Sequence, residues 1–501
     1  MKQLVSKIAA ISLAMSVTGG CSPGCDYRQY AGKPSKGAEK GVVTLLTKSG
    51  LDNRTKTILD RIDMTFEAIV EPGTIDVDGK IYYKYSRAVA NMQPESLSAD
   101  FSQEDGTVEF ILQFKPVRFT LIVTQYDSGA LVSVCKDVEV NVQDVSSLVD
   151  LDPTGGANGP SFIVADANGG IGQVSVNLGN DCGFEHADIL KQELTKVFSR
   201  ACIDAVKEFP PRLTQLGDTY LGLDISPYSY FKIDSSIPPV GKPALEMGAS
   251  LGESNLEVTS KGLVLEAPLW LKGTPGPIPA DSPPSFPDLD PEGDSYDYAI
   301  AFRKSVIEQL FDSAFNSGLL DIDLYSTSLL NGPTTNDLEK WFPGLEELAP
   351  KAPLLLRLRP KLEPSLYFTG ESLMIDLSGL SADLYFLMDD AFVRLSGGSM
   401  SMKLTLKFIQ GEDGPAASME CSGFVHDSPL FNEMFSEKTS QKNAEKGLEY
   451  LISRLISRNM ETVLPWILAS PSEMLYKSFE VRGSEEPYLY MYFDLKDSAG
   501  S

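Results

Sequence analysis

The feature that most limits how this chain can fold is a proline-rich stretch running from Pro268 to Pro291. Proline fixes φ and removes a backbone donor, so neither a helix nor a central strand is expected to continue through such a run. We therefore interpret the stretch as a semi-rigid linker between two halves of the chain.

The two halves show the same order of expected elements. Each begins with a strand and an amphipathic helix, continues through strands in which apolar and polar residues alternate, and closes with a long helix followed by a strand. The alternation means that one face of each sheet is buried. The strands expected at the ends of the halves are residues 42–46, 221–225, 299–302 and 488–495. This repeated order predicts an internal duplication of the architecture.

Four helices carry an apolar stripe at the 3,4 spacing of an amphipathic helix. The opening helices contribute Ile58 and Ile62 in the first half, and Val306, Leu310, Phe311, Ala314 and Phe315 in the second. The closing helices contribute Leu190, Leu194, Val197, Phe198 and Ala201, and then Leu448, Leu451, Ile452, Leu455 and Ile456. Such a stripe covers a sheet whether the space between them is filled or hollow. Periodicity therefore leaves both a packed core and a lipid cavity open.

The first twenty residues are typical of an export signal. Two lysines, Lys2 and Lys7, precede an apolar stretch at residues 8–17 that is too short to span a bilayer. Thr18-Gly-Gly-Cys21 then resembles the bacterial lipoprotein cleavage box, in which the cysteine is lipidated, for example with palmitate, although Thr18 stands where Leu is usual. An ordinary secretory signal is the alternative.

Residues 22–40 are polar, and we expect a flexible tether there. Ser22 lacks the acidic side chain that retains some lipoproteins in the inner membrane. We therefore expect an exported protein that is anchored to the outer membrane through Cys21 and faces the periplasm or the cell surface.

Charge and motif content exclude several functions. The net charge is −26, which argues against nucleic acid as a partner. The sequence has only two histidines and no Cys-x-x-Cys pair, so no metal site is expected. Acidic loops such as residues 288–294 lack the bidentate Glu of a calcium loop, and we expect turns there, with a calcium site as the alternative. We predict no catalytic residues, no cofactor and no enzymatic activity.

Several segments carry a resemblance to a known family. They are Gly41-Val-Val-Thr-Leu-Leu-Thr-Lys-Ser-Gly-Leu-Asp52, the strand and helix from Tyr298 to Ile322, Pro353-Leu-Leu-Leu-Arg-Leu-Arg-Pro360, and the proline linker. On these, residues 41–495 resemble the tubular lipid-binding proteins, the group of bactericidal/permeability-increasing protein, lipopolysaccharide-binding protein and the plasma lipid transfer proteins. The resemblance implies an α+β fold of two elongated, highly twisted antiparallel β-barrels. Each barrel wraps a long helix, and a central sheet joins them into a pseudo-twofold boomerang.

The expected domains follow from the resemblance and the linker. They are a signal peptide (1–20), a tether (21–40), an N-terminal lipid-binding barrel (41–220), central-sheet strands with the linker (221–294), a C-terminal lipid-binding barrel (295–470) and returning strands (471–495).

The resemblance also implies a cargo and a disulfide. Lipid would lie between helix and sheet in contact with the four stripes, and each buried CH₂ contributes about 0.8 kcal/mol. In the family's N-terminal barrel a disulfide joins a strand to the closing helix. The resemblance therefore implies the disulfide Cys135–Cys202, with Cys182 as the rival partner of Cys135. The family's endotoxin-binding members are basic, whereas this chain is acidic. A phospholipid or another neutral or zwitterionic lipid therefore fits better.

We thus expect a lipid-binding or lipid-transfer lipoprotein of the bacterial envelope. The alternative is a structural or adhesion protein with filled barrels that binds a protein partner. A third hypothesis is a hydrolase that uses carboxylates.

Overall fold

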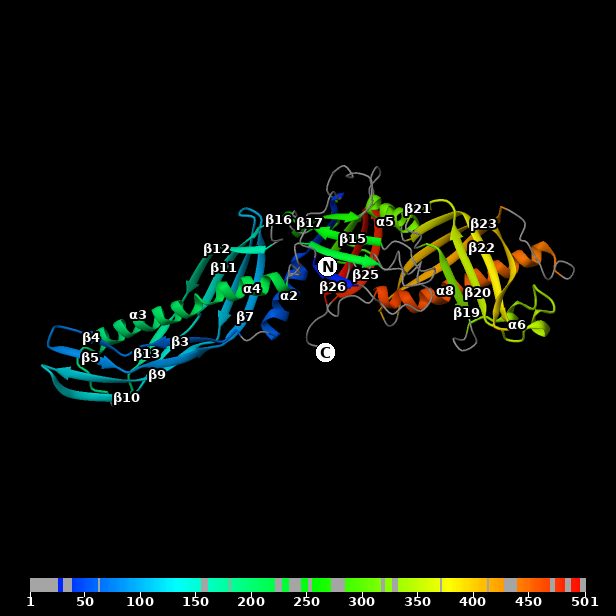
Figure 1. Cartoon of the computed structure of the whole chain (residues 1–501). Helices are drawn as coiled ribbons and strands as arrows, with labels where there is room; N and C mark the ends of the chain where they lie inside the picture. The colour runs from blue at the N-terminus through cyan, green and yellow to red at the C-terminus, as the bar shows by residue number, and fades with distance from the viewer. Residues whose placement is uncertain are drawn as a thin grey trace.

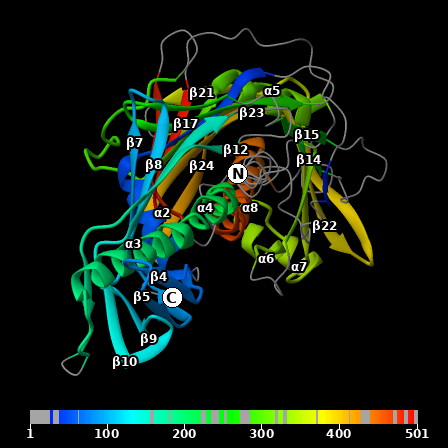
Figure 2. The same cartoon turned by 90° about the vertical axis from the view of Figure 1, so that its left-hand side faces the viewer.

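The computed structural model is an elongated α+β molecule whose sheets are antiparallel. It describes residues 26–29, 38–61, 64–154, 161–179, 182–220, 228–233, 245–250, 255–271, 284–316, 320–326, 332–369, 372–411, 414–427, 439–468, 474–482 and 488–495. Figure 1 shows two arms extending from a central sheet, each with one long helix. We call residues 48–220 the N-terminal arm and residues 304–468 the C-terminal arm. In Figure 2 the long helix of the C-terminal arm lies near the middle of the view, and that of the N-terminal arm runs from there toward the left.

The central sheet joins the two halves of the chain. Its strand order is β1-β14-β15-β17-β2-β18-β26-β25, with β16 paired to β17. The strands are β1 (Asp26–Gln29), β2 (Ala38–Leu46), β14 (Tyr228–Ile233), β15 (Leu245–Ser250), β16 (Asn255–Thr259), β17 (Gly262–Leu271), β18 (Tyr298–Arg303), β25 (Met474–Arg482) and β26 (Tyr488–Leu495). The opening strands of the halves, β2 and β18, pair with each other, and each has a late strand of its own half on its other side. This arrangement fits an internal duplication.

Alternation along these strands gives the sheet two different apolar faces. Val43 and Leu45 of β2 belong to a cluster that Phe286 and Tyr296 also join, so the segment before β18 covers one face. The other face serves both arms, because Val42 lies in the core of the C-terminal arm and Leu46 in the core of the N-terminal arm. The central sheet is therefore part of both cores.

Asp297 fixes the N-terminal arm to this sheet. Its carboxylate accepts hydrogen bonds from Ser49 Oγ at 2.5 Å, Asn53 Nδ2 at 2.7 Å and the Leu495 backbone N–H at 2.9 Å. Its carbonyl accepts the backbone N–H of Thr47 at 3.0 Å. The first turn of helix α2 (Lys48–Arg61) is thereby tied to β18 and β26.

The strands of the N-terminal arm form three sheets. Their orders are β13-β10-β9-β5-β4, β12-β11-β8-β7 and β3-β6. The strands are β3 (Phe66–Val70), β4 (Gly73–Asp76), β5 (Ile81–Tyr85), β6 (Ala88–Met92), β7 (Pro94–Ser102), β8 (Thr107–Phe114), β9 (Val117–Asp127), β10 (Ala130–Val142), β11 (Ser146–Thr154), β12 (Ser161–Gly170) and β13 (Val174–Asn177). Helices α3 (Ala187–Val206) and α4 (Phe209–Tyr220) lie along these sheets.

The three sheets meet at one level of the arm, where three strand runs break together. The breaks lie at residues 93, 115–116 and 143–145. The Phe114 N–H donates to the Val145 carbonyl at 2.9 Å, and the Lys115 N–H donates to the Gln93 carbonyl at 3.0 Å. Pro116 has no N–H to continue a ladder, so the chain leaves one sheet and enters the next. The strands of this arm therefore belong to three sheets that join at this level.

The C-terminal arm has one six-stranded sheet, β19-β20-β22-β23-β24, with β21 paired to β22. Its strands are β19 (Ile322–Ser326), β20 (Leu354–Pro360), β21 (Ser365–Thr369), β22 (Ser372–Met388), β23 (Ala391–Gly411) and β24 (Gly414–His426). Its helices are α5 (Lys304–Asn316), α6 (Thr335–Leu338), α7 (Leu345–Leu348) and α8 (Gln441–Leu468). The long helix α8 packs against β24.

Three sequence predictions need correction or lie outside the described residues. Residues 26–29 of the expected tether form strand β1, which pairs with β14. The expected linker begins late, because β17 continues through Pro268 to Leu271, with a register shift between Ala267 and Leu269 that accommodates the proline. Helix α4 follows α3 where only a strand was expected, and the strand expected at 221–225 lies outside the described residues. Two prolines stand in the first turn of α4, where their missing N–H groups cost nothing.

Candidate functional site

Helix α3 turns its predicted stripe toward the strands of the N-terminal arm. Leu190, Leu194 and Phe198 follow at intervals of four residues, so they share one side of the helix, and all three are fully buried. The Phe198 ring meets the Phe119 ring of β9 edge-on, with centroids 4.7 Å apart. The flanking members of the stripe, which are partly buried against the same core, are Val197 and Ala201. The stripe therefore forms one wall of the arm's apolar interior.

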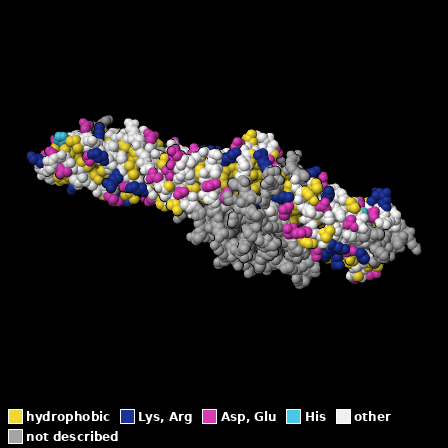
Figure 3. Space-filling model, turned by 90° about the horizontal axis from the view of Figure 1, so that it is seen from above, with side chains coloured by type: hydrophobic (Ala, Val, Ile, Leu, Met, Phe, Trp, Pro, Cys, Tyr) yellow, Lys and Arg dark blue, Asp and Glu magenta, His cyan; other side chains and the backbone are white. Residues whose placement is uncertain are grey.

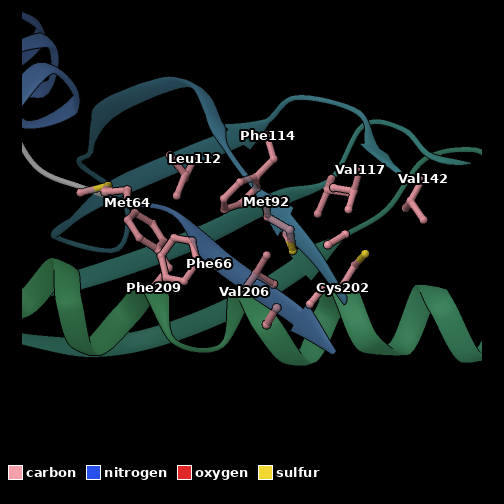
Figure 4. Close-up of a cluster of buried hydrophobic side chains, with 14 of the residues drawn as sticks. Met64, Phe66, Met92, Leu112, Phe114, Val117, Val142, Cys202, Val206 and Phe209 are labelled. Atoms are coloured by element: carbon pink, nitrogen blue, oxygen red, sulfur yellow. The ribbon is translucent and has the colours of Figure 1, made fainter. Parts of the chain in front are cut away.

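The same interior continues toward the central sheet, where α4 closes it. Figure 4 shows Phe66 of β3 and Phe209 of α4 facing each other, with Leu112 and Phe114 on the strands above them. The Phe66 centroid lies 5.7 Å from that of Phe114 and 6.5 Å from that of Phe209, both edge-on. The predicted residue Ile58 of α2 is buried in this core, whereas Ile62 lies outside the described residues.

The C-terminal arm has the same construction. On α5, Val306 and Phe311 are buried and Phe315 is partly buried against the same core. Leu310 and Ala314 lie in α5, but their side chains are outside the described part of the chain. The predicted residues of α8 are all buried in this core, namely Leu448, Leu451, Ile452, Leu455 and Ile456. The described members of both stripes predicted for this arm therefore lie in one interior.

Polar side chains inside these interiors were missed by the sequence analysis. Tyr83 of β5 and Gln125 of β9 are fully buried in the N-terminal arm, and Ser396 of β23 is fully buried in the C-terminal arm. Tyr83 Oη, Gln125 Nε2 and Ser396 Oγ have no hydrogen-bond partner in the described structure. One signal was visible, because Gln125 continues the inward-facing run Phe119, Leu121, Val123 of an alternating strand.

The predicted disulfide Cys135–Cys202 is wrong. Cys135 of β10 bonds to Cys182, with Cα atoms 5.7 Å apart, and Cys202 is a free, buried thiol. The reason is the position of the helix. Cys182 precedes α3 at the far end of the arm, where β10 begins, whereas Cys202 lies about 22 Å further along the helix axis.

The chemistry available to the described side chains is limited. Burial raises the pKa of the Cys202 and Cys421 thiols to about 12, so neither forms the thiolate that a nucleophilic cysteine needs. Gly248-Ala-Ser-Leu-Gly252 has the G-x-S-x-G spacing of a nucleophile elbow, a match that the sequence analysis missed. An elbow places its serine between a strand and a helix, whereas Ser250 ends β15 and the next described element is strand β16.

The acidic loops form turns. Asp290 Oδ1 accepts the N–H groups of Glu292 and Asp294, and Asp78 Oδ1 accepts those of Lys80 and Ile81. Among the described residues, no group of three His, Cys, Asp or Glu side chains is placed to hold a metal ion. No helix in the described ranges is long and apolar enough to cross a membrane.

Comparisons with known proteins find likeness only in structure. No family model matches the sequence, and no curated protein matches it. Among solved structures, the chain is similar to lipopolysaccharide binding protein, with 12% identity over 92% of this chain and 99% of that chain and a TM-score of 0.47. It is also similar to P47 from Clostridium botulinum A2, with 9% identity over 91% of this chain and 98% of that one and a TM-score of 0.28. P47 of Clostridium botulinum E1 follows, with 10% identity, 92% and 100% coverage and a TM-score of 0.23. The first of these belongs to the group that the sequence resembles.

Proposed function

We propose that this protein binds lipids, holds their acyl chains in the apolar interiors of its two arms, and carries them without chemical change. The observation that carries the proposal is the shared construction of the arms. In each arm the described apolar stripe of a long helix packs into a core that it shares with antiparallel strands. An acyl chain that replaces water contacts with such side chains gains about 0.8 kcal/mol per CH₂. Two ordinary acyl chains are therefore enough to drive binding without a charged anchor.

The surface charge favours an uncharged or zwitterionic cargo. The chain carries 69 acidic and 43 basic residues. On the face shown in Figure 3, acidic and basic side chains are interspersed. Anionic headgroups are recognised through clustered Lys and Arg, so this distribution supports phospholipids of no net charge or neutral lipids as cargo.

The proposal includes export and an anchor. Cys21 and the signal that precedes it lie outside the described residues, so the anchor rests on the sequence alone. Mass spectrometry of the mature N-terminus tests it. A diacylglyceryl group on Cys21 is expected, and a mature chain that begins elsewhere without lipid would reject the anchor but leave the carrier function standing.

The carrier function is tested by lipid mass spectrometry on the whole chain carrying Cys21→Ser, so that no anchor lipid contributes. One or two co-purifying lipid molecules per chain are expected. A protein that is free of lipid and takes up no fluorescent phospholipid would favour the alternative, an envelope protein with filled arms that binds a protein partner. The close contact between the Phe198 and Phe119 rings supports this alternative, because it fills space between the helix and the strands.

Bulky substitutions then locate the cargo. Leu194→Trp is expected to block uptake in the N-terminal arm, and Leu455→Trp in the C-terminal arm, because each adds volume on the buried side of its helix. Matched controls on the same helices are Ile189→Trp and Tyr450→Trp, whose side chains are exposed. Unchanged loading in both buried variants would reject the assignment of the stripes to lipid.

A further inference from the structure

The far end of the N-terminal arm contains two polar groups that its apolar interior does not satisfy. Tyr83 and Gln125 lie directly opposite each other on β5 and β9, on the inward face of the sheet, and both are fully buried. Directly opposed residues have Cβ atoms about 5 Å apart, so the two side chains are neighbours. Tyr83 Oη and Gln125 Nε2 lack a hydrogen-bond partner in the described structure. Leaving a buried polar group unpaired is costly, so this pair points to a bound group.

The remaining contacts orient both side chains and leave their donors unused. Gln125 Oε1 accepts the backbone N–H of Glu185 at 3.2 Å, which fixes the amide and leaves its NH₂ group to donate elsewhere. The Tyr83 ring packs edge-on against Phe184, with centroids 5.5 Å apart. The segment that supplies Phe184 and Glu185 is tied to β10 by the Cys135–Cys182 disulfide. The pair is thus covered by a segment that is covalently held in place.

The local field selects against a negative ligand. Burial raises the pKa of Tyr83, and the Glu185 carboxylate raises it further, so the hydroxyl stays protonated and able to donate. A hydroxyl donor and an amide donor suit an acceptor oxygen, and the nearby carboxylate disfavours a phosphate or a fatty-acid carboxylate.

We propose that Tyr83 and Gln125 form a polar subsite that binds the carbonyl oxygen of an uncharged, ester-linked lipid inside the N-terminal arm. The inference rests on the proposed carrier function and deepens it. The subsite places an ester group beside β5 and β9, and the acyl chain extends along the apolar stripe of α3 toward the central sheet. The cargo is therefore distinguished by its carbonyl as well as by its chain length.

The test compares two probes that differ only in their two ester carbonyl groups. The whole chain, carrying Cys21→Ser, is offered equal amounts of 1,2-dioleoylglycerol and 1,2-di-O-oleylglycerol, and bound lipid is quantified by mass spectrometry. The ester is expected to be enriched about five- to tenfold, the size of one or two net hydrogen bonds. Tyr83→Phe and Gln125→Met are each expected to lower the ratio, and the double variant is expected to bring it close to one.

The matched control is Tyr82→Phe, the same change one residue earlier on the outward face, where Tyr82 stacks on Tyr126. It should keep the wild-type ratio. Tyr83→Phe removes only an unpaired hydroxyl, so its melting temperature without lipid should equal or exceed that of the wild type. Dioleoylphosphatidic acid serves as a third probe and should bind more weakly than dioleoylglycerol.

The outcomes separate this inference from the carrier function. If both glycerol lipids bind but the ratio is the same in the wild type and in Tyr83→Phe, the subsite is rejected and the pair holds only a buried water, while the carrier stands. Phosphatidic acid binding as tightly as dioleoylglycerol would reject an uncharged ligand. If no probe binds to any variant, the carrier function itself fails.

Discussion

The Cys135–Cys182 disulfide makes a prediction whose size follows from the structure. The bonded residues are 47 apart in sequence, and the bond closes a loop that contains β11, β12 and β13. On the chain-entropy model, a loop of this length stabilises the folded arm by about 4 kcal/mol at 25 °C. Cys182→Ser should therefore raise the opening equilibrium of the N-terminal arm by up to roughly a thousandfold.

The assay must report on this arm specifically. The three tryptophans, Trp270, Trp341 and Trp466, all lie outside residues 48–220, so their fluorescence is a poor probe. Hydrogen exchange of peptides from β10 and α3, measured by mass spectrometry with and without reductant, follows the arm directly. Reductant should speed exchange in the wild type and change nothing in Cys182→Ser.

Cys202→Ala is the control for the pairing. It removes the thiol that the sequence resemblance had paired with Cys135, and it should cost only about 1 kcal/mol from the lost buried sulfur. Its exchange should still accelerate in reductant. If Cys202→Ala instead lost its response to reductant while Cys182→Ser kept it, the pairing in the structure would be wrong.

Three further predictions concern the joint, the C-terminal arm and the α3 wall. Asp297→Ala leaves the Leu495 N–H buried and unpaired, so the free energy of unfolding in urea should fall by about 3 kcal/mol. Gly50→Ala should also lower the free energy of unfolding, because its new Cβ would clash with the Asp297 carbonyl oxygen. Burial and the neighbouring Glu363 raise the pKa of Asp312 to about 7, so the folded state binds more protons than the unfolded state between about pH 4 and 7. Stability from this pair is therefore lost as pH rises through that window, and Asp312→Asn should flatten the pH dependence; an unchanged slope would contradict the reasoning. Phe198 is fully buried, so Phe198→Ala should lower the free energy of unfolding by about 3–5 kcal/mol in thermal unfolding. A decrease below about 1 kcal/mol would contradict the buried contacts of Phe198.

The apolar stripes and the alternating strands were predictable because they rest on long, periodic signals. The stripe of α3 and the alternation of β9 each extend over many residues, so each indicates which side of its element is buried. The resemblance implied a central sheet, but the pairing of β2 with β18 within it was not predicted. Strand order depends on contacts between distant residues, which periodicity does not encode.

The errors arose where one local feature decides the geometry. The strand breaks around Pro116 look like ordinary loops in sequence, and only their alignment across three strands makes them a change of sheet. The disulfide was assigned to Cys202 because the family pattern joins a strand to the closing helix. That pattern did not take into account how far along the helix Cys202 lies. Gln125 was missed because only the apolar residues of the alternating strand β9 were considered as inward-facing, although Gln125 occupies the next inward position.

The two arms share more than a linker, and this affects how cargo acts on the fold. Tyr298 packs against the cores of both arms, and Val42 and Leu46 of the same strand enter different cores. Cargo that binds only the folded protein stabilises it by RT ln(1 + [L]/Kd), about 2.7 kcal/mol at a hundredfold excess over Kd. Because the central sheet belongs to both cores, part of the stabilisation that lipid gives one arm extends to the sheet strands of the other. Loading of one arm should therefore slow hydrogen exchange in β2 and β18 as well as in its own helix, and separate, unlinked responses of the arms would mean that the central sheet does not couple them.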